Sequence, residues 1–275
     1  ALGGLILSGR ASAGTYSMTL SYYMLFPTVM FLDELLERFS IKLLLFTSIS
    51  LLVILALGSR GAVLCIVVFV FLKFIRPSIK LNYQRLLAYF SIFCAGLFGI
   101  IFFDRVLEFF NNILIGFGIR SRSISLFLKG EIYLSGRDRI YRVLIDKISE
   151  KPILGIGIGG DRQVIGGGYA HNIFLELLAD FGVIVGSLVG VAILIFIVIA
   201  LFIKDQEKRN MMIIWTSLGF VHLMVSSSYL TDMKFAILMG LVTKGIMEKN
   251  HSRTNRNNTL KNTRHVKEGD IPYGT

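Results

Sequence analysis

Residues 135–182 read SGRDRIYRVLIDKISEKPILGIGIGGDRQVIGGGYAHNIFLELLADFG, and the interpretation of the whole chain depends on this stretch. It combines a charged amphipathic segment, a turn region rich in proline and glycine, and a His-Asn pair. Long apolar runs lie on both sides of it, at 86–103 and at 183–203. A polar insert of this length between runs long enough to cross a bilayer is where we expect the chemistry to take place, because ionisable groups are costly inside the membrane.

The composition indicates a membrane protein. The chain has 275 residues, of which 54% are hydrophobic, whereas soluble domains have about 45–50%. Several apolar runs approach or exceed the roughly 18 residues that a transmembrane helix needs. We therefore predict an all-α fold, a polytopic transmembrane helical bundle with a large extracytoplasmic loop. Spanning helices are expected near 17–36, 41–57, 60–76, 86–103, 173–203, 211–228 and 232–247.

The basic residues of the short loops predict the orientation. They cluster between the third and fourth spans, between the fifth and sixth, and in the tail: Lys73, Arg76, Lys80, Arg85, Lys204, Lys208 and Arg209. The positive-inside rule makes this side cytoplasmic, and the long loop then faces outward. We predict four parts: N-terminal transmembrane helices (1–103), an extracytoplasmic catalytic loop (104–172), C-terminal transmembrane helices (173–248) and a disordered basic cytoplasmic tail (249–275). Because the chain does not start with Met, we expect further helices upstream of the first part.

The net charge of +11 does not by itself indicate binding of nucleic acid. A basic tail next to a membrane is typically a determinant of topology near anionic lipid. We expect membrane lipid, and no nucleic acid, among the partners.

A helix is predicted within the loop over residues 137–150. Its apolar residues share one face and most of its charged residues share the other: Ile140, Val143, Leu144 and Ile148 against Asp138, Arg139, Arg142 and Lys147. Pro152 ends it, because the residue before a proline is pushed out of the α region. Such a helix either lies on the outer leaflet or covers a cavity.

The fifth span is longer than a bilayer requires. Gly182, Gly186 and Gly190 recur every four residues, which predicts a small-residue face for close helix packing. The span proper is then about 182–203, and residues 172–181 form its outer extension. Asn172, Glu176 and Asp180 would line one stripe of that extension, although acidic residues near a helix N-terminus can simply complement the helix dipole.

The candidate catalytic residues lie on the outer side. His171 is placed at a helix N-terminus, where the dipole disfavours the charged imidazole and leaves a neutral one suited to general base work. Arg60, Arg137 and Arg10 offer guanidinium groups that bind phosphate bidentately. Non-catalytic interpretations also stay open. His171 could be an ordinary residue at the membrane interface, and the side chain of Arg60 could extend to the lipid headgroups. The loop contains no group of His and carboxylate residues at the spacing of metal ligands. We therefore predict no metal and no other cofactor.

The residues Gly155, Gly157 and Gly160 match the pattern G-x-G-x-x-G. A dinucleotide site would require a βαβ unit around this pattern. Here the glycines follow a proline in a loop between membrane helices, so we interpret them as flexible turns.

Three motifs together resemble the O-antigen ligase and O-antigen polymerase superfamily of bacterial envelope enzymes. They are Ser59-Arg60-Gly61 opening a helix, Ser135-Gly-Arg137 before an amphipathic helix, and Pro152-Ile-Leu-Gly155-Ile-Gly157 leading to His171-Asn172-Ile-Phe-Leu175. Gly182 also fits, and the motifs cover residues 59–190. Arg10 resembles the upstream arginine motif of the family only loosely, since Ser17-Met18 replaces the usual Asn-Pro pair.

The resemblance implies an inverting, metal-independent glycosyltransferase of the bacterial inner membrane with its active face outside the cytoplasm. By this analogy the donor is a glycan on undecaprenyl diphosphate, and the acceptor is either a second lipid-linked glycan or the lipid A core. His171 would activate the acceptor hydroxyl, and Arg60 and Arg137 would stabilise the diphosphate. Asn172, Arg10, Arg139 and Glu176 are the substrate-binding candidates.

Two other classes stay open from the sequence. A transporter or flippase of lipid-linked sugars is one, although its ionisable residues would be expected near the bilayer midplane rather than at the outer face. A non-catalytic membrane scaffold is the other, and it leaves the arrangement of Arg and His unexplained.

Overall fold

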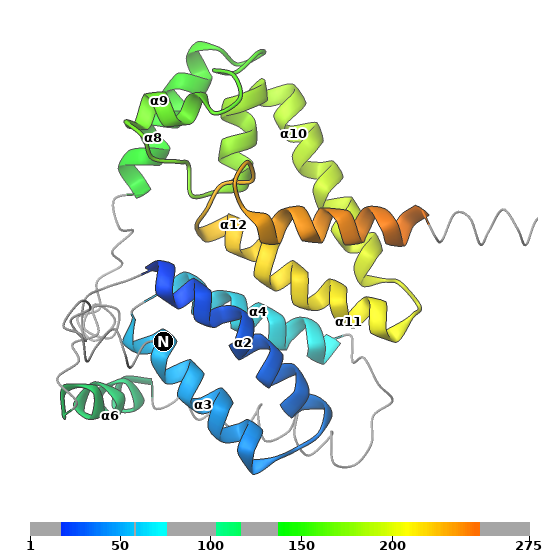
Figure 1. Ribbon diagram of the computed structural model, residues 1–275. Helices are drawn as coiled ribbons and strands as arrows, with labels where there is room; N and C mark the ends of the chain where they lie inside the picture. Colours follow the sequence, from blue (N-terminus) through cyan, green and yellow to red (C-terminus); the bar gives the residue numbers. More distant parts are fainter. Residues whose placement is uncertain (1–17, 58, 76–102, 117–136, 248–275) are drawn as a thin grey trace, which may run out of the picture.

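The computed structural model describes residues 18–57, 59–75, 103–116 and 137–247, and every regular element in these ranges is a helix (Figure 1). The all-α prediction is confirmed. The helices are α2 (Met18–Glu37), α3 (Ile41–Ala56), α4 (Arg60–Ile75), α6 (Phe103–Gly116), α8 (Arg137–Glu150), α9 (Gly160–Ile165), α10 (Ile173–Leu201), α11 (Gln206–Trp215), the π-helical turn η1 (Thr216–Phe220) and α12 (Val221–Val225). A last helix covers residues 233–247.

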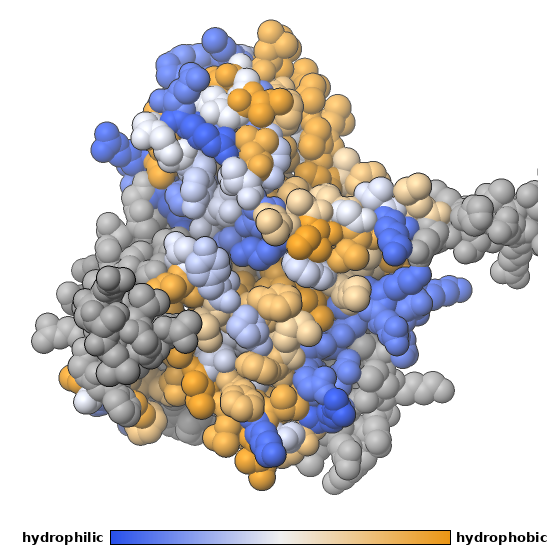
Figure 2. Space-filling model, in the orientation of Figure 1, coloured by the Kyte–Doolittle hydropathy of each residue, from blue (hydrophilic) through white to orange (hydrophobic). Residues whose placement is uncertain are grey.

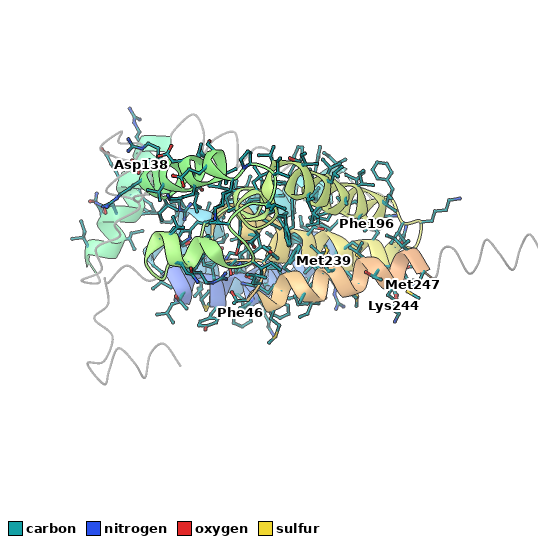
Figure 3. All side chains as sticks on the ribbon, turned by 90° about the horizontal axis from the view of Figure 1, so that it is seen from above. Phe46, Asp138, Phe196, Met239, Lys244 and Met247 are labelled. Atoms are coloured by element: carbon teal, nitrogen blue, oxygen red, sulfur yellow. The ribbon has the colours of Figure 1, made fainter. Side chains whose placement is uncertain are left out.

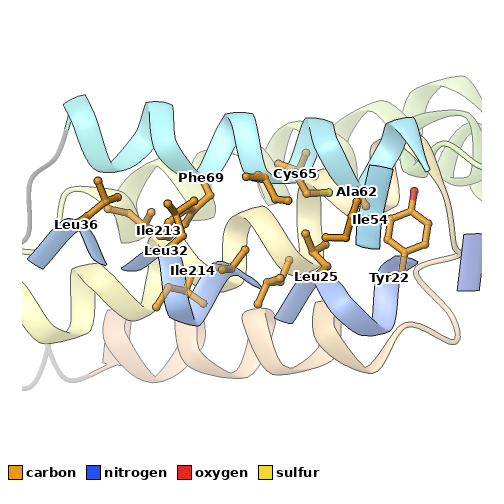
Figure 4. Close-up of a cluster of buried hydrophobic side chains, with 14 of the residues drawn as sticks. Tyr22, Leu25, Leu32, Leu36, Ile54, Ala62, Cys65, Phe69, Ile213 and Ile214 are labelled. Atoms are coloured by element: carbon orange, nitrogen blue, oxygen red, sulfur yellow. The ribbon is translucent and has the colours of Figure 1, made fainter. Parts of the chain in front are cut away.

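The main bundle is formed by α2, α3, α4 and the continuous helix from α11 through η1 to α12 (Figure 1). Its core is a cluster of buried apolar side chains from all four of these parts, among them Leu25 of α2, Phe69 of α4 and Ile213 of α11 (Figure 4). Burial of a side chain of this size contributes about 1.5–3 kcal/mol, so the core holds segments together that are far apart in the sequence.

Polar contacts define the two ends of this bundle. At one end Asn210, next to the start of α11, bonds both Asp33 of α2 and Lys73 of α4. At the other end Tyr22, near the start of α2, lies against Gly61 in the first turn of α4. Helices α2 and α4 therefore run in the same direction, and α11 to α12 runs against them.

Most predicted spans coincide with observed helices to within a few residues. The predicted span at 86–103 lies outside the described residues apart from its last residue. Helix α6 was not predicted, although its sequence FDRVLEFFNNILIG places apolar side chains at helical spacing. The prediction also placed Lys73 in the basic cluster between the third and fourth spans, whereas Lys73 lies within α4, buried and paired with Asp33.

Helix α10 does not continue straight through residue 182 as expected. Gly182 has φ 77° and ψ 175°, so the helix divides into a first arm, 173–181, and a second arm, 183–201. The first arm folds back along the second. A Cβ on Gly186 would lie 2.5 Å from the carbonyl oxygen of Leu177, and one on Gly190 would lie 3.1 Å from Cδ1 of Phe174. The small-residue packing face is confirmed, and its partner is the first arm of the same helix.

Among the described residues, α10 is the one helix that is both long and apolar enough to cross a bilayer, and residues 41–55 of α3 are apolar but shorter. The second arm alone has 19 residues and spans about 28 Å at 1.5 Å per residue. Its apolar side chains are largely exposed, and so are many on α3. Figure 3 shows Phe46 of α3 and Phe196 of α10 on the outside of the molecule.

Helix α8 has the bounds that the sequence predicted, Arg137–Glu150. Its apolar face does not point to open space. Leu144 and Ile148 are buried together with Ala170 and with Ala179 of the first arm of α10. The helix therefore covers the first arm with that face. Figure 2 shows hydrophilic side chains gathered over α8 and α9 and again before α11, with more hydrophobic surface between them.

Candidate active site

The Ser-Arg-Gly motif begins α4. The hydroxyl of Ser59 accepts a hydrogen bond from the backbone N–H of Ala62 (3.3 Å), which fixes the first turn and places Arg60 in it. The glycine is required for space, because a Cβ on Gly61 would overlap the hydroxyl oxygen of Tyr22. The motif thus brings an arginine and a tyrosine hydroxyl to the same end of the bundle.

His171 has an unusual backbone and an unusual environment. Its φ of 56° is left-handed, a region that few residues other than glycine adopt and that is often found at functional sites. Its Nδ1 is buried, and among the described residues no hydrogen-bond partner reaches it. Its ring lies 4.2 Å from the ring of Tyr169, centroid to centroid. Because buried polar atoms normally have partners, Nδ1 of His171 is an expected position for a substrate group.

Burial and the guanidinium of Arg137 lower the pKa of His171 to about 4. The imidazole is therefore neutral at pH 7, as predicted, but for a different reason. The sequence suggested the helix dipole, whereas the structure assigns the effect first to burial and then to Arg137.

Arg137 connects two of the sequence motifs. It is the first residue of α8 and is half-buried. Its charge acts on His171 and also on Tyr22. Since Tyr22 lies against Gly61, the charge of Arg137 acts toward the end of the bundle where the Ser-Arg-Gly motif begins α4.

Asn172 caps the first arm of α10. Its side-chain oxygen accepts hydrogen bonds from the backbone N–H groups of Phe174 (3.0 Å) and Leu175 (3.2 Å). The cap satisfies two donors that a helix N-terminus otherwise leaves unpaired. It also fixes the residue that directly follows His171.

Glu176 is fully buried and engaged with protein groups. The hydroxyl of Ser228 and the backbone N–H of Tyr229 donate to its carboxylate, and Nη2 of Arg162 lies 3.8 Å from Oε1. The side chain therefore ties α10 to the loop after α12.

Asp180 and Asp161 extend this network to the glycine-rich segment. Asp180 accepts from the backbone N–H of Gly159 (3.0 Å) and from the hydroxyl of Tyr229 (2.5 Å). Asp161 accepts from the backbone N–H of Ala170 (3.1 Å), immediately before His171. Asp180 of the polar stripe, together with Asp161 outside it, therefore holds in place the segment that leads to His171.

The glycine-rich segment forms turns, as predicted. Gly155, Gly157 and Gly159 all have positive φ, and no strand lies in the described part of the chain on either side of them. A Cβ on Gly155 would lie 2.6 Å from the backbone nitrogen of Gly182. The turn thus packs directly on the bend of α10.

The remaining predicted site residues are less informative. Arg139 is exposed on α8, and Arg10 lies outside the described residues. In the described ranges no three His, Cys, Asp or Glu side chains come together in a way that could hold a metal ion.

The structure adds residues that the sequence reasoning missed. Nδ1 of His222 lies 2.8 Å from the carboxylate of Asp232, and the ring of His222 lies 4.0 Å from that of Tyr22. Nζ of Lys234 lies 5.7 Å from the centroid of the Tyr22 ring. These residues come from α2, α12 and the last helix, so no local pattern in the sequence could have grouped them.

Comparison with known proteins gives one match. Residues 45–190, more than half of the chain, match the family described as O-antigen ligase. That range includes Arg60, Arg137 and His171. Neither a curated protein nor a solved structure matches the chain.

Proposed function

The chain belongs to the O-antigen ligase family, and from this premise we propose that it transfers a glycan from undecaprenyl diphosphate to a sugar hydroxyl with inversion at the transferred carbon. The family indicates a membrane glycosyltransferase of the ligase or polymerase type in polysaccharide biosynthesis. The donor, the acceptor, the stereochemistry and the independence of metal are parts of the proposal.

The observation that carries the proposal is the buried Nδ1 of His171, which no group in the described part of the chain hydrogen-bonds and whose ring has a pKa lowered by burial and by the charge of Arg137. In the proposed reaction the acceptor hydroxyl attacks the anomeric carbon, and its proton passes to the imidazole of His171. The bond between that carbon and the phosphate oxygen breaks, and its electron pair leaves with the diphosphate. His171 then releases the proton to solvent. A base with a pKa near 4 keeps its lone pair available at neutral pH.

Arg60 and Arg137 would stabilise the charge that develops on the departing diphosphate. Guanidinium groups suit this role because they stay charged and present paired donors. Asn172 would keep His171 in position through its cap. Arg10, Arg139 and Glu176 remain proposed substrate-binding residues, and the burial of Glu176 favours an indirect contribution through the loop that it holds.

We place the reaction on the extracytoplasmic face of the bacterial inner membrane in a multi-pass protein. The arrangement supports this topology, because Lys204 and Lys208 are exposed near the end of the bundle opposite His171. The proposed parts are transmembrane helices at 1–103 and 173–248, a catalytic loop at 104–172 and a cytoplasmic tail at 249–275. Exposed apolar side chains along α3 and the second arm of α10 agree with contact to lipid.

Transfer by the full-length protein tests the proposal. Purified protein would receive lipid-linked repeat units, with and without lipid A core and with and without a chelator. We expect His171→Gln and Arg137→Ala to reduce transfer by about a hundredfold or more, the loss typical of a transition-state donor. Arg142→Ala is the matched control, because Arg142 lies on the same helix but is exposed and paired with Asp138. Full activity of His171→Gln would refute the general base.

The acceptor that the protein uses distinguishes the two proposed activities, polymerase and ligase. Chain lengthening without lipid A core would identify a polymerase, and product that forms only with the core would identify a ligase. If no product forms while lipid-linked glycan still crosses vesicle membranes, the protein is a transporter. If neither activity is detected, the scaffold interpretation gains support.

A further inference from the structure

Residues from three other segments, α4, α12 and the last helix, lie close to Tyr22. A Cβ on Gly61 would touch its hydroxyl and would lie 3.0 Å from Cγ2 of Val225. The ring of His222 lies 4.0 Å away, Nζ of Lys234 lies 5.7 Å from its centroid, and the charge of Arg137 acts on it. Tyr22 is thus the point where α2, α4, α12 and the last helix approach one another, and the charge of Arg137, at the start of α8, also acts there.

The position of Lys234 is electrostatically unfavourable for the protein alone. Lys234 is the second residue of the helix over 233–247, and a cation in the first turn of a helix opposes the helix dipole. A second cation, Arg137, acts on the same tyrosine ring. A lysine that served stability alone would be expected at the other end of the helix, where Lys244 lies.

The nearby carboxylate of Asp232 interacts favourably with Lys234 but is shared with other partners. Asp232 is engaged by Nδ1 of His222 at 2.8 Å and by the backbone N–H groups of Lys234 (2.9 Å) and Phe235 (3.2 Å). Nζ of Lys234 instead lies over the ring of Tyr22, which is a weak attraction at this distance. An anion bound next to Tyr22 would compensate Lys234 and Arg137 together.

We propose that Lys234 is a further diphosphate-binding residue, held in position by the ring of Tyr22. This inference rests on the proposed function, since the anion it names is the diphosphate of the lipid-linked donor. Lysine binds phosphate as a point charge, whereas Arg60 and Arg137 can bind it bidentately. The aromatic ring keeps Nζ at this end of the bundle, and the ring of His222, which is paired with Asp232, packs 4.0 Å from that of Tyr22.

Binding of two lipids that differ only in the headgroup tests the inference. Full-length protein in detergent would be titrated with undecaprenyl diphosphate and with undecaprenol, which lacks phosphate. We expect Lys234→Met to bind undecaprenyl diphosphate about tenfold more weakly, the change expected for loss of one charge-assisted hydrogen bond. Its affinity for undecaprenol should not change. Lys234→Arg should retain most of the diphosphate affinity.

The matched control is Lys244→Met, which removes an exposed lysine from the far end of the same helix. Equal binding of undecaprenyl diphosphate by wild type, Lys234→Met and Lys244→Met would overturn the inference and leave the proposed function intact. If wild type binds the two lipids equally well, the proposed donor itself is wrong. If Lys234→Met loses affinity for both lipids alike, its role is structural, and the inference fails.

Discussion

The buried ion pair between Lys73 and Asp33 gives a prediction about stability. The side chain of Lys73 is 2% exposed and that of Asp33 is 10% exposed, and the two form a salt bridge. Nζ of Lys73 also lies 3.5 Å from Oε1 of Glu37 and donates to Oδ1 of Asn210 at 2.6 Å. Asn210 in turn donates to Asp33 at 2.8 Å. The cluster joins α2, α4 and the start of α11.

Replacing Lys73 by Met removes the cation and leaves the carboxylate of Asp33 buried. Loss of one partner of a buried pair costs about 3–5 kcal/mol, chiefly because the remaining charge is neither solvated nor paired. The double variant Lys73→Met/Asp33→Asn removes that charge as well, so it should recover most of the lost stability. Glu37 contributes less to the cost, because its side chain is 30% exposed and partly solvated.

Unfolding in detergent measures this effect. Trp215 is the single tryptophan of the chain and packs against the bundle core, so its fluorescence reports the loss of that core. The control is Arg38→Met, which breaks the Arg38–Glu34 pair on α2. That pair is exposed, with Arg38 at 81%, and its loss should cost less than about 1 kcal/mol. The reasoning is refuted if Lys73→Met costs no more than Arg38→Met, or if the double variant is no more stable than the single one.

Three further predictions concern the glycines and the candidate base. Gly182→Ala should abolish the bend of α10, because the φ of Gly182 is 77° and a Cβ there would overlap the carbonyl oxygen of Ile153. Loss of transfer activity with an unchanged helical circular dichroism spectrum would support this prediction. Normal transfer activity would contradict it. Gly61→Ala should displace Tyr22 and weaken binding of undecaprenyl diphosphate, which the titration described above measures; unchanged binding would count against it. For His171, the rate of transfer should rise with pH through about 4 rather than 6.5, because the base must be deprotonated and its pKa is lowered. A rate that rises only near pH 6.5 would indicate that the imidazole is not buried in the working enzyme.

Several features could be predicted from the sequence because their causes are local. Helix α8 ends where Pro152 requires it to end, and its apolar spacing indicates which face is buried. The glycines at 155 and 157 form turns, as a proline-glycine segment suggests. Arg60, Arg137 and His171 were found through motifs, and each motif sits at the start of a helix or directly before one.

Other features could not be predicted because their causes are distant in the chain. The spacing of Gly182, Gly186 and Gly190 indicates close packing, but it does not say that the partner is the preceding arm of the same helix. Lys73 resembles a basic residue of a cytoplasmic loop until Asp33, forty residues earlier, is placed beside it by the bundle. The group around Tyr22 depends in the same way on tertiary contacts between α2 and the last helix.

The two ends of the bundle therefore differ in their electrostatics. At the end near α11, Lys73 is matched by Asp33, and this cluster needs no ligand to be stable. At the other end Arg137 and Lys234 act on Tyr22, and the carboxylate of Asp232 is engaged by His222. An anion bound next to Tyr22 would interact favourably with both cations. A ligand that binds only the folded state stabilises it by RT ln(1 + [L]/Kd). Undecaprenyl diphosphate should therefore raise the unfolding temperature of the wild type more than that of Lys234→Met, while both should respond equally to undecaprenol.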